Sequence, residues 1–201
     1  MDLEKRIEAH RRLLSDICCP ERKVNIDTLE RVLRLAMEIA REGREGKKIG
    51  TMFVVSDTKE TLRNSRPLIL DPLYGHPDSK KKIDDPNMRE TVKELAQLDG
   101  AFIVSDEGVV ISACRYINAT TRGISLPLGL GSRHVAAASI TKKTNAVAVV
   151  VSESSMVRVF DNGEIIGEFI PEVWMLRQYT SELRESFEAK SEEEISVVGT
   201  S

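Results

Sequence analysis

The sequence predicts a mixed α/β fold with a central mixed β-sheet flanked by helices. Short apolar runs rich in valine and isoleucine alternate with amphipathic segments of helical period, which is typical of a sheet covered by helices. Some of these runs are separated only by tight glycine turns and others by whole helices, so we expect both antiparallel and parallel strand pairs. The length of 201 residues fits one main domain with small terminal extensions.

The first part of the chain predicts two helices and a strand. Residues 2–17 form a weakly amphipathic, highly charged helix, so residues 1–26 are interpreted as an N-terminal helical appendage. A second helix is predicted to begin at Asp27, whose side chain can cap the amide of Glu30. The apolar run IGTMFVV at 49–55 then predicts a buried strand.

A long polar segment follows this strand. Residues 56–85 are interrupted by prolines and are expected to form an irregular surface excursion. Asp85 and Pro86 have the residue types of an N-cap and a first helical position, so the next helix is predicted to begin there. The run GAFIVS-DEG-VVISACRYI then predicts two strands joined by a tight turn.

The second half predicts another helix, a strand and a hairpin. A glycine- and proline-rich loop leads into SRHVAAASIT, an alanine-rich helix for which Ser132 is a natural N-cap. The run NAVAVVVSES predicts a buried strand, and a later Asn-Gly pair fits the type I′ turn of a hairpin. A last helix is predicted from Pro171, so the main domain is assigned to 27–189 and a mobile acidic tail to 190–201.

The composition excludes several classes of function. Lys plus Arg is 29, Asp plus Glu is 32 and aromatic residues make up 4%, so nucleic acid is not expected as a partner. No apolar run approaches the roughly 18 residues of a membrane span. The N-terminal segment also lacks the apolar core of a secretory signal. The three cysteines form no disulfide framework, so we expect a cytoplasmic protein that makes no membrane contact.

The strongest signal for chemistry is the segment GLGSRH, from Gly129 to His134, which runs into the alanine-rich helix. Glycines such as Gly131 let a ligand approach the backbone closely, and a helix N-terminus offers unpaired N–H groups. Arg133 and His134 would add cationic donors beside Ser132, which together predicts a phosphate site. The segment matches neither a Walker loop nor a dinucleotide fingerprint. On spacing alone, an ordinary capped helix with two surface polar residues is an equally good interpretation.

Two further polar pairs lie where strands begin or end. Asp99 precedes Gly100 and Ala101 at a helix-to-strand junction, where a carboxylate can hold a divalent metal or accept a proton from a sugar hydroxyl. Ser152 and Glu153 follow a buried strand, a position at which open sheets commonly form sites. Taken alone, each pair is more often an Asp-Gly turn or a solvent-facing strand end.

Taken in order, these three signals resemble the diadenylate cyclase domain family. The chain has DGA, then GSRH followed after one residue by two alanines, then Ser-Glu after an apolar strand. LAQLDGAFIVSDEGVVISACRYI is similar to the central hairpin of that family, LGLGSRHVAAASIT to its LGTRHRAA segment, and IGTMFVV to its first strand. The resemblance covers roughly residues 27–170. It implies the diadenylate cyclase domain fold. The Glu- and Lys-rich helices and the departures from the family pattern suit a member of archaeal or otherwise divergent type.

The resemblance also implies a reaction, the condensation of two ATP molecules into the second messenger cyclic di-AMP with release of two pyrophosphates. Each subunit of the family holds one ATP and half of the reaction centre, so we expect a face-to-face homodimer, with a higher homo-oligomer as an open alternative. A divalent cation, Mn²⁺ or Mg²⁺, would relieve the repulsion between the nucleophile and the polyphosphate. Asp99 would bind this metal and help to deprotonate the 3′-hydroxyl, and Glu153 would be a second metal ligand.

By the same resemblance, ATP binding falls on residues of all three motifs and of the central hairpin. Gly100 and Ala101 would let the nucleotide lie close to the backbone. Tyr116 and Ile117 fall where the family packs the adenine ring. The residues expected near the phosphates are Gly131, Ser132, Arg133, His134, Ser152 and Glu153.

Two positions depart from the family pattern. The second arginine, after the histidine, is Val135 here, so one phosphate-contacting charge is missing or comes from elsewhere. The candidates to supply it are Arg115, Arg122 and Arg158. The second glutamate of the family's Ser-Glu-Glu motif is Ser154, so the metal shell would differ.

The sequence leaves two other functions open. A non-catalytic nucleotide sensor that keeps the pocket without turnover would also suit the two departures. A scaffold that assembles through its N-terminal helix is the third hypothesis, and it predicts that Asp99→Asn leaves function unchanged. Neither a DNA-binding module nor a membrane anchor accompanies the motifs, so the DNA-scanning and membrane-bound branches of the family are not indicated.

Overall fold

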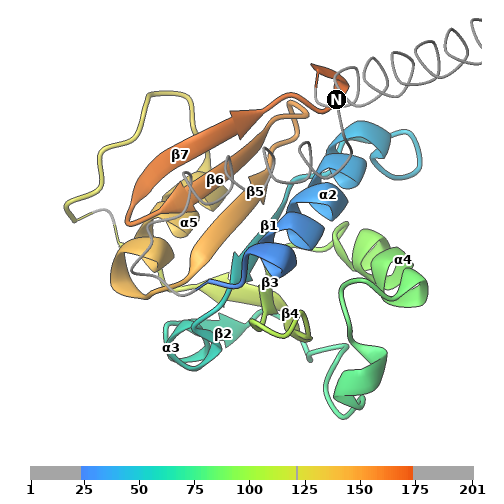
Figure 1. Cartoon of the computed structure of the whole chain (residues 1–201). Coiled ribbons are helices and arrows are strands. Elements are labelled where there is room, and N and C mark those ends of the chain that lie inside the picture. The colour runs from blue at the N-terminus through green and yellow to red at the C-terminus, as the bar shows by residue number, and fades with distance from the viewer. Residues whose placement is uncertain (1–23, 121, 174–201) are drawn as a thin grey trace, which may run out of the picture.

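A seven-stranded mixed β-sheet forms the centre of the computed structural model, which describes residues 24–120 and 122–173 (Figure 1). The strand order is β2-β4-β3-β1-β5-β6-β7. The middle strand β1 (Thr51–Val55) runs parallel to β3 (Ala101–Val104) and antiparallel to β5 (Val147–Val151). The remaining pairs are antiparallel and involve β2 (Ser65–Pro67), β4 (Val110–Ile117), β6 (Val157–Asp161) and β7 (Glu164–Phe169). The predicted mixed sheet is confirmed.

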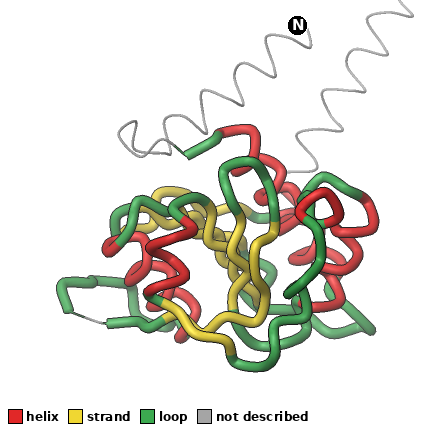
Figure 2. The backbone as a smooth tube through the Cα atoms, turned by 90° about the horizontal axis from the view of Figure 1, so that it is seen from below, coloured by secondary structure: helices red, strands yellow, loops and turns green. Residues whose placement is uncertain are grey.

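Helices cover both faces of this sheet (Figures 1 and 2). Helices α2 (Ile26–Glu42) and α4 (Pro86–Leu95) pack on one face, and α5 (Ser132–Lys143) packs on the other. Side chains of a strand alternate between the faces, so Phe53 of β1 packs toward α2 while its neighbour Met52 packs toward α5. The sheet is therefore buried on both sides, which explains why its middle strands are almost continuously apolar.

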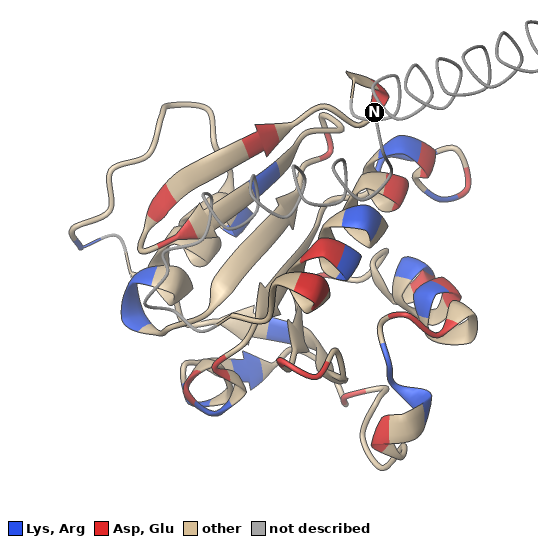
Figure 3. Ribbon diagram, in the orientation of Figure 1, with Lys and Arg blue, Asp and Glu red and all other residues tan. Residues whose placement is uncertain are grey.

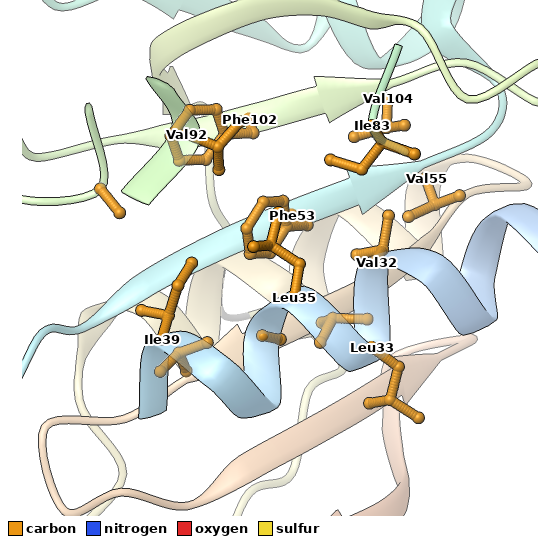
Figure 4. Close-up of a cluster of buried hydrophobic side chains, with 14 of the residues drawn as sticks. Val32, Leu33, Leu35, Ile39, Phe53, Val55, Ile83, Val92, Phe102 and Val104 are labelled. Atoms are coloured by element: carbon orange, nitrogen blue, oxygen red, sulfur yellow. The ribbon is translucent and has the colours of Figure 1, made fainter. Parts of the chain in front are cut away.

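The larger of the two cores lies between α2 and the sheet (Figure 4). Val32, Leu35 and Ile39 of α2 are fully or almost fully buried and face the stacked rings of Phe53 and Phe102, whose centroids lie 5.1 Å apart. Truncating such a buried leucine to alanine costs about 2–5 kcal/mol of folding free energy. This core fixes β1 and β3, the two strands whose starts support the site described below.

The N-terminus of α2 differs from the prediction. The N-cap is Asn25, whose side chain accepts a hydrogen bond from the Thr28 amide at 3.1 Å, whereas Asp27 lies inside the first turn. The predicted Asp27 cap is therefore wrong, because Asn25 already has the extended backbone that an N-cap needs. The Asp85 cap of α4 is confirmed, since this side chain accepts from the Asn87 and Met88 amides.

The outer surfaces of α2 and α4 carry charges of both signs, whereas the middle strands are uncharged (Figure 3). Lys93 of α4 lies 3.3 Å from carboxylate oxygens of both Glu38 and Glu42 on α2. Arg89 pairs with Glu38 at 2.5 Å, so the two helices are joined by ion pairs above their shared core. No helix within residues 24–120 and 122–173 has the length and apolar character needed to cross a membrane.

Other predicted segments have mixed outcomes. The surface segment 56–85 is not wholly irregular, because it contains α3 (Thr58–Arg63), the edge strand β2 and a short 3-10 helix, Asp78–Lys80. The type I′ turn between β6 and β7 is confirmed by positive φ values of 49° at Asn162 and 85° at Gly163. The predicted helix 2–17, most of the helix from Pro171 and the acidic tail lie outside the described residues.

Candidate active site

The direction of the strands brings two of the predicted motifs together. Because β3 runs parallel to β1 and β5 runs antiparallel to it, the start of β3 and the end of β5 lie at the same edge of the sheet. Asp99 and Gly100 directly precede β3, and Ser152 and Glu153 directly follow β5. The third motif, at the start of α5, contacts both of the others through one side chain.

That side chain is Arg133, in the first turn of α5. Its Nη2 lies 3.1 Å from Oδ1 of Asp99, and its Nη1 lies 3.2 Å from Oε1 of Glu153. The two carboxylates are 87% and 69% exposed, so solvent screens both ion pairs and each contributes little to stability. The three charged groups thus lie together at the surface and contribute little to stability. They are therefore available to bind a ligand.

Two adjoining cavities meet at this point, and both are lined by Ser132 and Arg133. The larger has a volume of about 740 Å³, which is ample for a nucleotide, and the smaller about 300 Å³. The larger cavity contains the predicted residues Asp99, Gly100, Tyr116 and Ile117, with Met52, Leu68, Arg115, Ala119, Val135 and Ala136. The smaller contains Gly129, Leu130, Gly131, His134, Val150, Val151, Ser152, Glu153, Ser154 and Arg158.

The N-terminus of α5 is not capped by a side chain. Gly131 occupies the N-cap position with an extended backbone, and Ser132 is the first helical residue, so the prediction of Ser132 as the N-cap is wrong. The amide of His134 donates to the Gly131 carbonyl at 3.1 Å, which closes the first turn. Because no side chain caps the helix, its first N–H groups stay available to an anion in the cavities.

His134 is buried rather than exposed in the cavity, with 6% of its surface accessible. Burial, together with the nearby charge of Arg158, lowers the pKa of His134 from its ordinary value of 6.5. A lowered pKa disfavours the imidazolium that the predicted cationic donor at His134 requires. Its Nε2 lies 3.2 Å from Nη1 of Arg158.

The DGA motif divides into residues that line the cavity and one that does not. Gly100 has φ of +112°, and a Cβ there would come within 2.6–2.8 Å of backbone atoms of Cys114 and Arg115. Glycine is therefore required here by the close approach of β4. Ala101 is fully buried in the core beneath α5 and lines neither cavity.

The central hairpin supplies the wall of the larger cavity. Tyr116 of β4 is 46% exposed, and the Arg66 guanidinium lies 4.7 Å from the centre of its ring. Ile117 is buried next to it and lines the same cavity. Beside Leu68, which is 40% exposed, these side chains make this wall apolar enough for a flat aromatic ligand.

The three arginines proposed to replace the missing family arginine lie in different environments. Arg115 lines the larger cavity, but its guanidinium donates to Ser65 and to the Leu62 carbonyl. Arg122 lines neither cavity. Arg158 lines the smaller cavity, next to His134.

Gly50 is part of the site and was missed from the sequence. A Cβ at this position, just before β1, would lie 2.6 Å from Nη1 of Arg133 and 3.2 Å from Cγ of Glu153. The residue lies in the predicted strand segment 49–55 but outside the three site motifs, and its φ is not in the left-handed region, so no local turn signal could have singled it out. Only the packing of Arg133 against the start of β1 reveals it.

The geometry agrees with a comparison to known protein families. Residues 38–165 match the family model described as DisA bacterial checkpoint controller nucleotide-binding, abbreviated DAC. The chain belongs to this family. The match includes all three motifs of the site and falls within the predicted main domain, although the boundaries of that domain stay predictions.

Two curated relatives are similar over most of this chain. A diadenylate cyclase of Methanocaldococcus jannaschii is 52% identical over 145 residues, which are 72% of this chain and 46% of that protein. A diadenylate cyclase of Haloferax volcanii is 40% identical over 144 residues, which are 71% of this chain and 52% of that protein. The chain thus spans about half the length of the curated relatives it matches.

Two solved structures align with part of this chain. A hypothetical membrane spanning protein from Bacillus cereus aligns with a TM-score of 0.51 and 19% identity, over 69% of this chain and 61% of that one. A double mutant of DacA from Staphylococcus aureus aligns with a TM-score of 0.49 and 18% identity, over 74% of this chain and 90% of that one. At this identity, the Bacillus cereus likeness concerns the fold alone.

Proposed function

We propose that this chain is a diadenylate cyclase that condenses two ATP molecules into cyclic di-AMP and two pyrophosphates. Membership of the DAC family and the similarity to two proteins named diadenylate cyclase support the reaction. The observation that carries the proposal is the position of Arg133, which contacts Asp99 and Glu153 at the uncapped N-terminus of α5. The reaction needs a triphosphate and an acid-base group close together, and the N-terminus of α5 with Asp99 can hold both.

In the proposed complex the nucleotide spans both cavities. The adenine would pack against Tyr116 and Ile117, whose cavity is the larger and more apolar one. The triphosphate would pass Ser132 and Arg133, which line both cavities, toward the smaller cavity. The uncapped amides of α5 would then face phosphate oxygens, an arrangement that favours negative charge at the helix N-terminus.

The reaction is two equivalent phosphoryl transfers. The 3′-oxygen of each ATP attacks the α-phosphorus of the other and forms a phosphodiester bond, while the bond from that phosphorus to the bridging oxygen breaks and pyrophosphate leaves. Asp99 would accept the proton of the attacking 3′-hydroxyl. Arg133 and the amides of α5 would hold the phosphates in line, so most of the rate enhancement comes from positioning and charge.

The carboxylates present also suit a divalent cation bound together with ATP. Within the described part of the chain, no group of three or more metal-binding side chains lies together, so an all-protein metal cage is not available there. Mg²⁺ commonly takes one or two carboxylates and completes its shell with substrate phosphates and water. Asp99 and Glu153, both exposed beside Arg133, would be those carboxylates. When bound, the cation offsets phosphate charge and so lowers the electrostatic barrier to attack.

The chemistry also requires a second copy of the chain. The product contains two identical phosphodiester bonds, so two ATP molecules related by two-fold symmetry must face each other, which a homodimer provides. Exposed apolar side chains in the segments that line the two cavities support such a contact: Leu68, Ile69, Leu70 and Leu128 are 40–103% exposed. We therefore expect the rate per subunit to rise with protein concentration until the dimer is saturated.

The test is to incubate the chain with ATP and Mg²⁺ or Mn²⁺ and to identify the products by chromatography and mass spectrometry. The proposal predicts cyclic di-AMP and pyrophosphate in a ratio of one to two. Bound but unreacted ATP would instead indicate a nucleotide sensor. Failure to bind ATP in the presence of either metal would contradict both functions.

A further inference from the structure

The smaller cavity contains a second arginine, Arg158 of β6, to which the proposed reaction assigns no role. It lines the cavity together with Arg133, His134 and Glu153. Its side chain is only 14% exposed, and its Nη1 lies 3.2 Å from Nε2 of His134. The guanidinium is therefore held at the cavity wall and is not extended into solvent.

The charge of this cavity depends on Arg158. The positive charge of Arg133 is offset twice, by Glu153 in the same cavity and by Asp99 in the adjoining one. His134 adds no positive charge near neutral pH, because burial lowers its pKa. The partner of Arg158 is Glu168 of β7, at 2.5 Å, and Glu168 does not line the cavity. Arg158 is thus the cation whose counter-ion lies outside the space that a ligand would fill.

The contact with His134 orients the guanidinium of Arg158. A guanidinium can only donate hydrogen bonds, so Nε2 of His134 accepts from Arg158 and the imidazole proton must lie on Nδ1. This Nδ1 is buried, and a backbone hydrogen bond at Gly131 acts on the ring. The imidazole thus holds one N–H of the Arg158 guanidinium at the cavity wall, and the other guanidinium donors lie beside it.

We propose that Arg158 binds the β- and γ-phosphates of ATP in the smaller cavity. This inference rests on the proposed function. It follows from the order of the two cavities, because the adenine and ribose would occupy the larger one and the phosphate chain passes Ser132 and Arg133 before it reaches Arg158. Arg158 would thereby supply, from β6, a positive charge that the first turn of α5 lacks at Val135.

The test compares the affinities of the chain for ATP and for AMP by isothermal titration calorimetry, with Mg²⁺ present. Arg158→Gln removes the charge, and we expect ATP binding to weaken about tenfold or more. AMP binding should be unchanged, because AMP has no β- or γ-phosphate. Arg158→Lys should restore part of the ATP affinity, since a point charge without the fork of donors remains.

The matched control is Glu168→Gln, which breaks the same ion pair but keeps the arginine. The inference predicts ATP binding that is unchanged or tighter in this variant, because the guanidinium loses its competing partner. A purely structural ion pair predicts a similar loss of affinity in both variants. If Arg158→Gln does not fold, as judged by circular dichroism, Glu168→Gln alone decides: weakened ATP binding overturns the inference.

Other results would also overturn the proposal for Arg158. ATP affinity that is unchanged in Arg158→Gln excludes a phosphate contact, and an equal loss for ATP and AMP shows a general disturbance of the site. In both cases a wild-type chain that still forms cyclic di-AMP leaves the proposed function intact. A wild-type chain that binds no ATP removes the proposed function and this inference together.

Discussion

The Arg133 guanidinium lies 3.1 Å from the Asp99 carboxylate across the mouth of two cavities. The two residues belong to different elements, the first turn of α5 and the turn before β3, and their ion pair is exposed. An exposed pair adds little to stability, so we attribute its position at the sheet edge to ligand binding by the two residues.

Asp99→Asn should abolish most of the cyclase activity while ATP still binds. The amide cannot accept the proton of the 3′-hydroxyl, and we expect the rate to fall about 100-fold or more. The measurement is the formation of cyclic di-AMP under saturating ATP. Asp84→Asn is the matched control, because Asp84 pairs with Arg31 on the surface and lines neither cavity. Equal rates for Asp99→Asn and the wild type would remove Asp99 from the mechanism.

Gly50→Ala should weaken ATP binding with little loss of stability. The new methyl group would lie 2.6 Å from Nη1 of Arg133, and the flexible arginine would move away from it. We expect about a tenfold loss in ATP affinity, the size of one charged hydrogen bond. A double-mutant cycle with Arg133→Gln checks the cause, because Gly50→Ala should have little effect once Arg133 is absent. Additive losses would show that Gly50 acts through something else.

Tyr116→Ala should weaken ATP binding about tenfold, whereas Tyr116→Phe should keep it, because the ring face and not the hydroxyl would stack on the adenine. The ring is 46% exposed at the wall of the larger cavity. Tyr74→Ala is the control, since Tyr74 is 87% exposed and lines neither cavity. A normal ATP affinity in Tyr116→Ala would place the base elsewhere.

The free energy of unfolding should fall as the pH drops below about 6.5, in part because of His134. Burial and the charge of Arg158 lower the pKa of His134 in the folded chain from 6.5. Between the lowered value and 6.5 the unfolded chain binds a proton that the folded chain does not, so acid favours unfolding in this window.

Urea unfolding at about pH 7.5 and about pH 5 would measure this effect. His134→Asn should show a smaller loss of stability between the two conditions than the wild type, because the titrating group is gone. His76→Asn, a change on the exposed surface, should behave like the wild type. If His134→Asn and the wild type lose the same free energy, another group is responsible.

The sequence predicts the parts of this protein that depend on local pattern. The apolar period of α2, the Asp85-Pro86 start of α4 and the Asn-Gly turn between β6 and β7 are local signals, and the structure contains all three elements. The edge strand β2 was not predicted, because its three residues carry no alternation and it forms only by pairing with β4. The N-caps of α2 and α5 were mispredicted, because Asn25 and Gly131 hold these positions instead of Asp27 and Ser132.

The candidate site could be predicted only as far as its motifs extend. The end of β5 and the start of β3 meet because of strand direction, which the sequence did not predict. The sequence indicated only through a family resemblance that their motifs belong to one site. The lowered pKa of His134 could not be predicted, because burial by surrounding elements causes it. Gly50 and the Arg158–His134 contact depend on packing between elements distant in sequence, so no local pattern encodes them.

The most direct test of the central claim is a crystal structure of the chain with an ATP analogue whose α–β bridge cannot be cleaved. We predict phosphate oxygens within hydrogen-bond distance of the Ser132 and Arg133 amides, with the ribose 3′-oxygen of a facing subunit directed at the α-phosphorus. A nucleotide bound away from the N-terminus of α5, with Arg133 still paired to Asp99 and Glu153, would contradict the account.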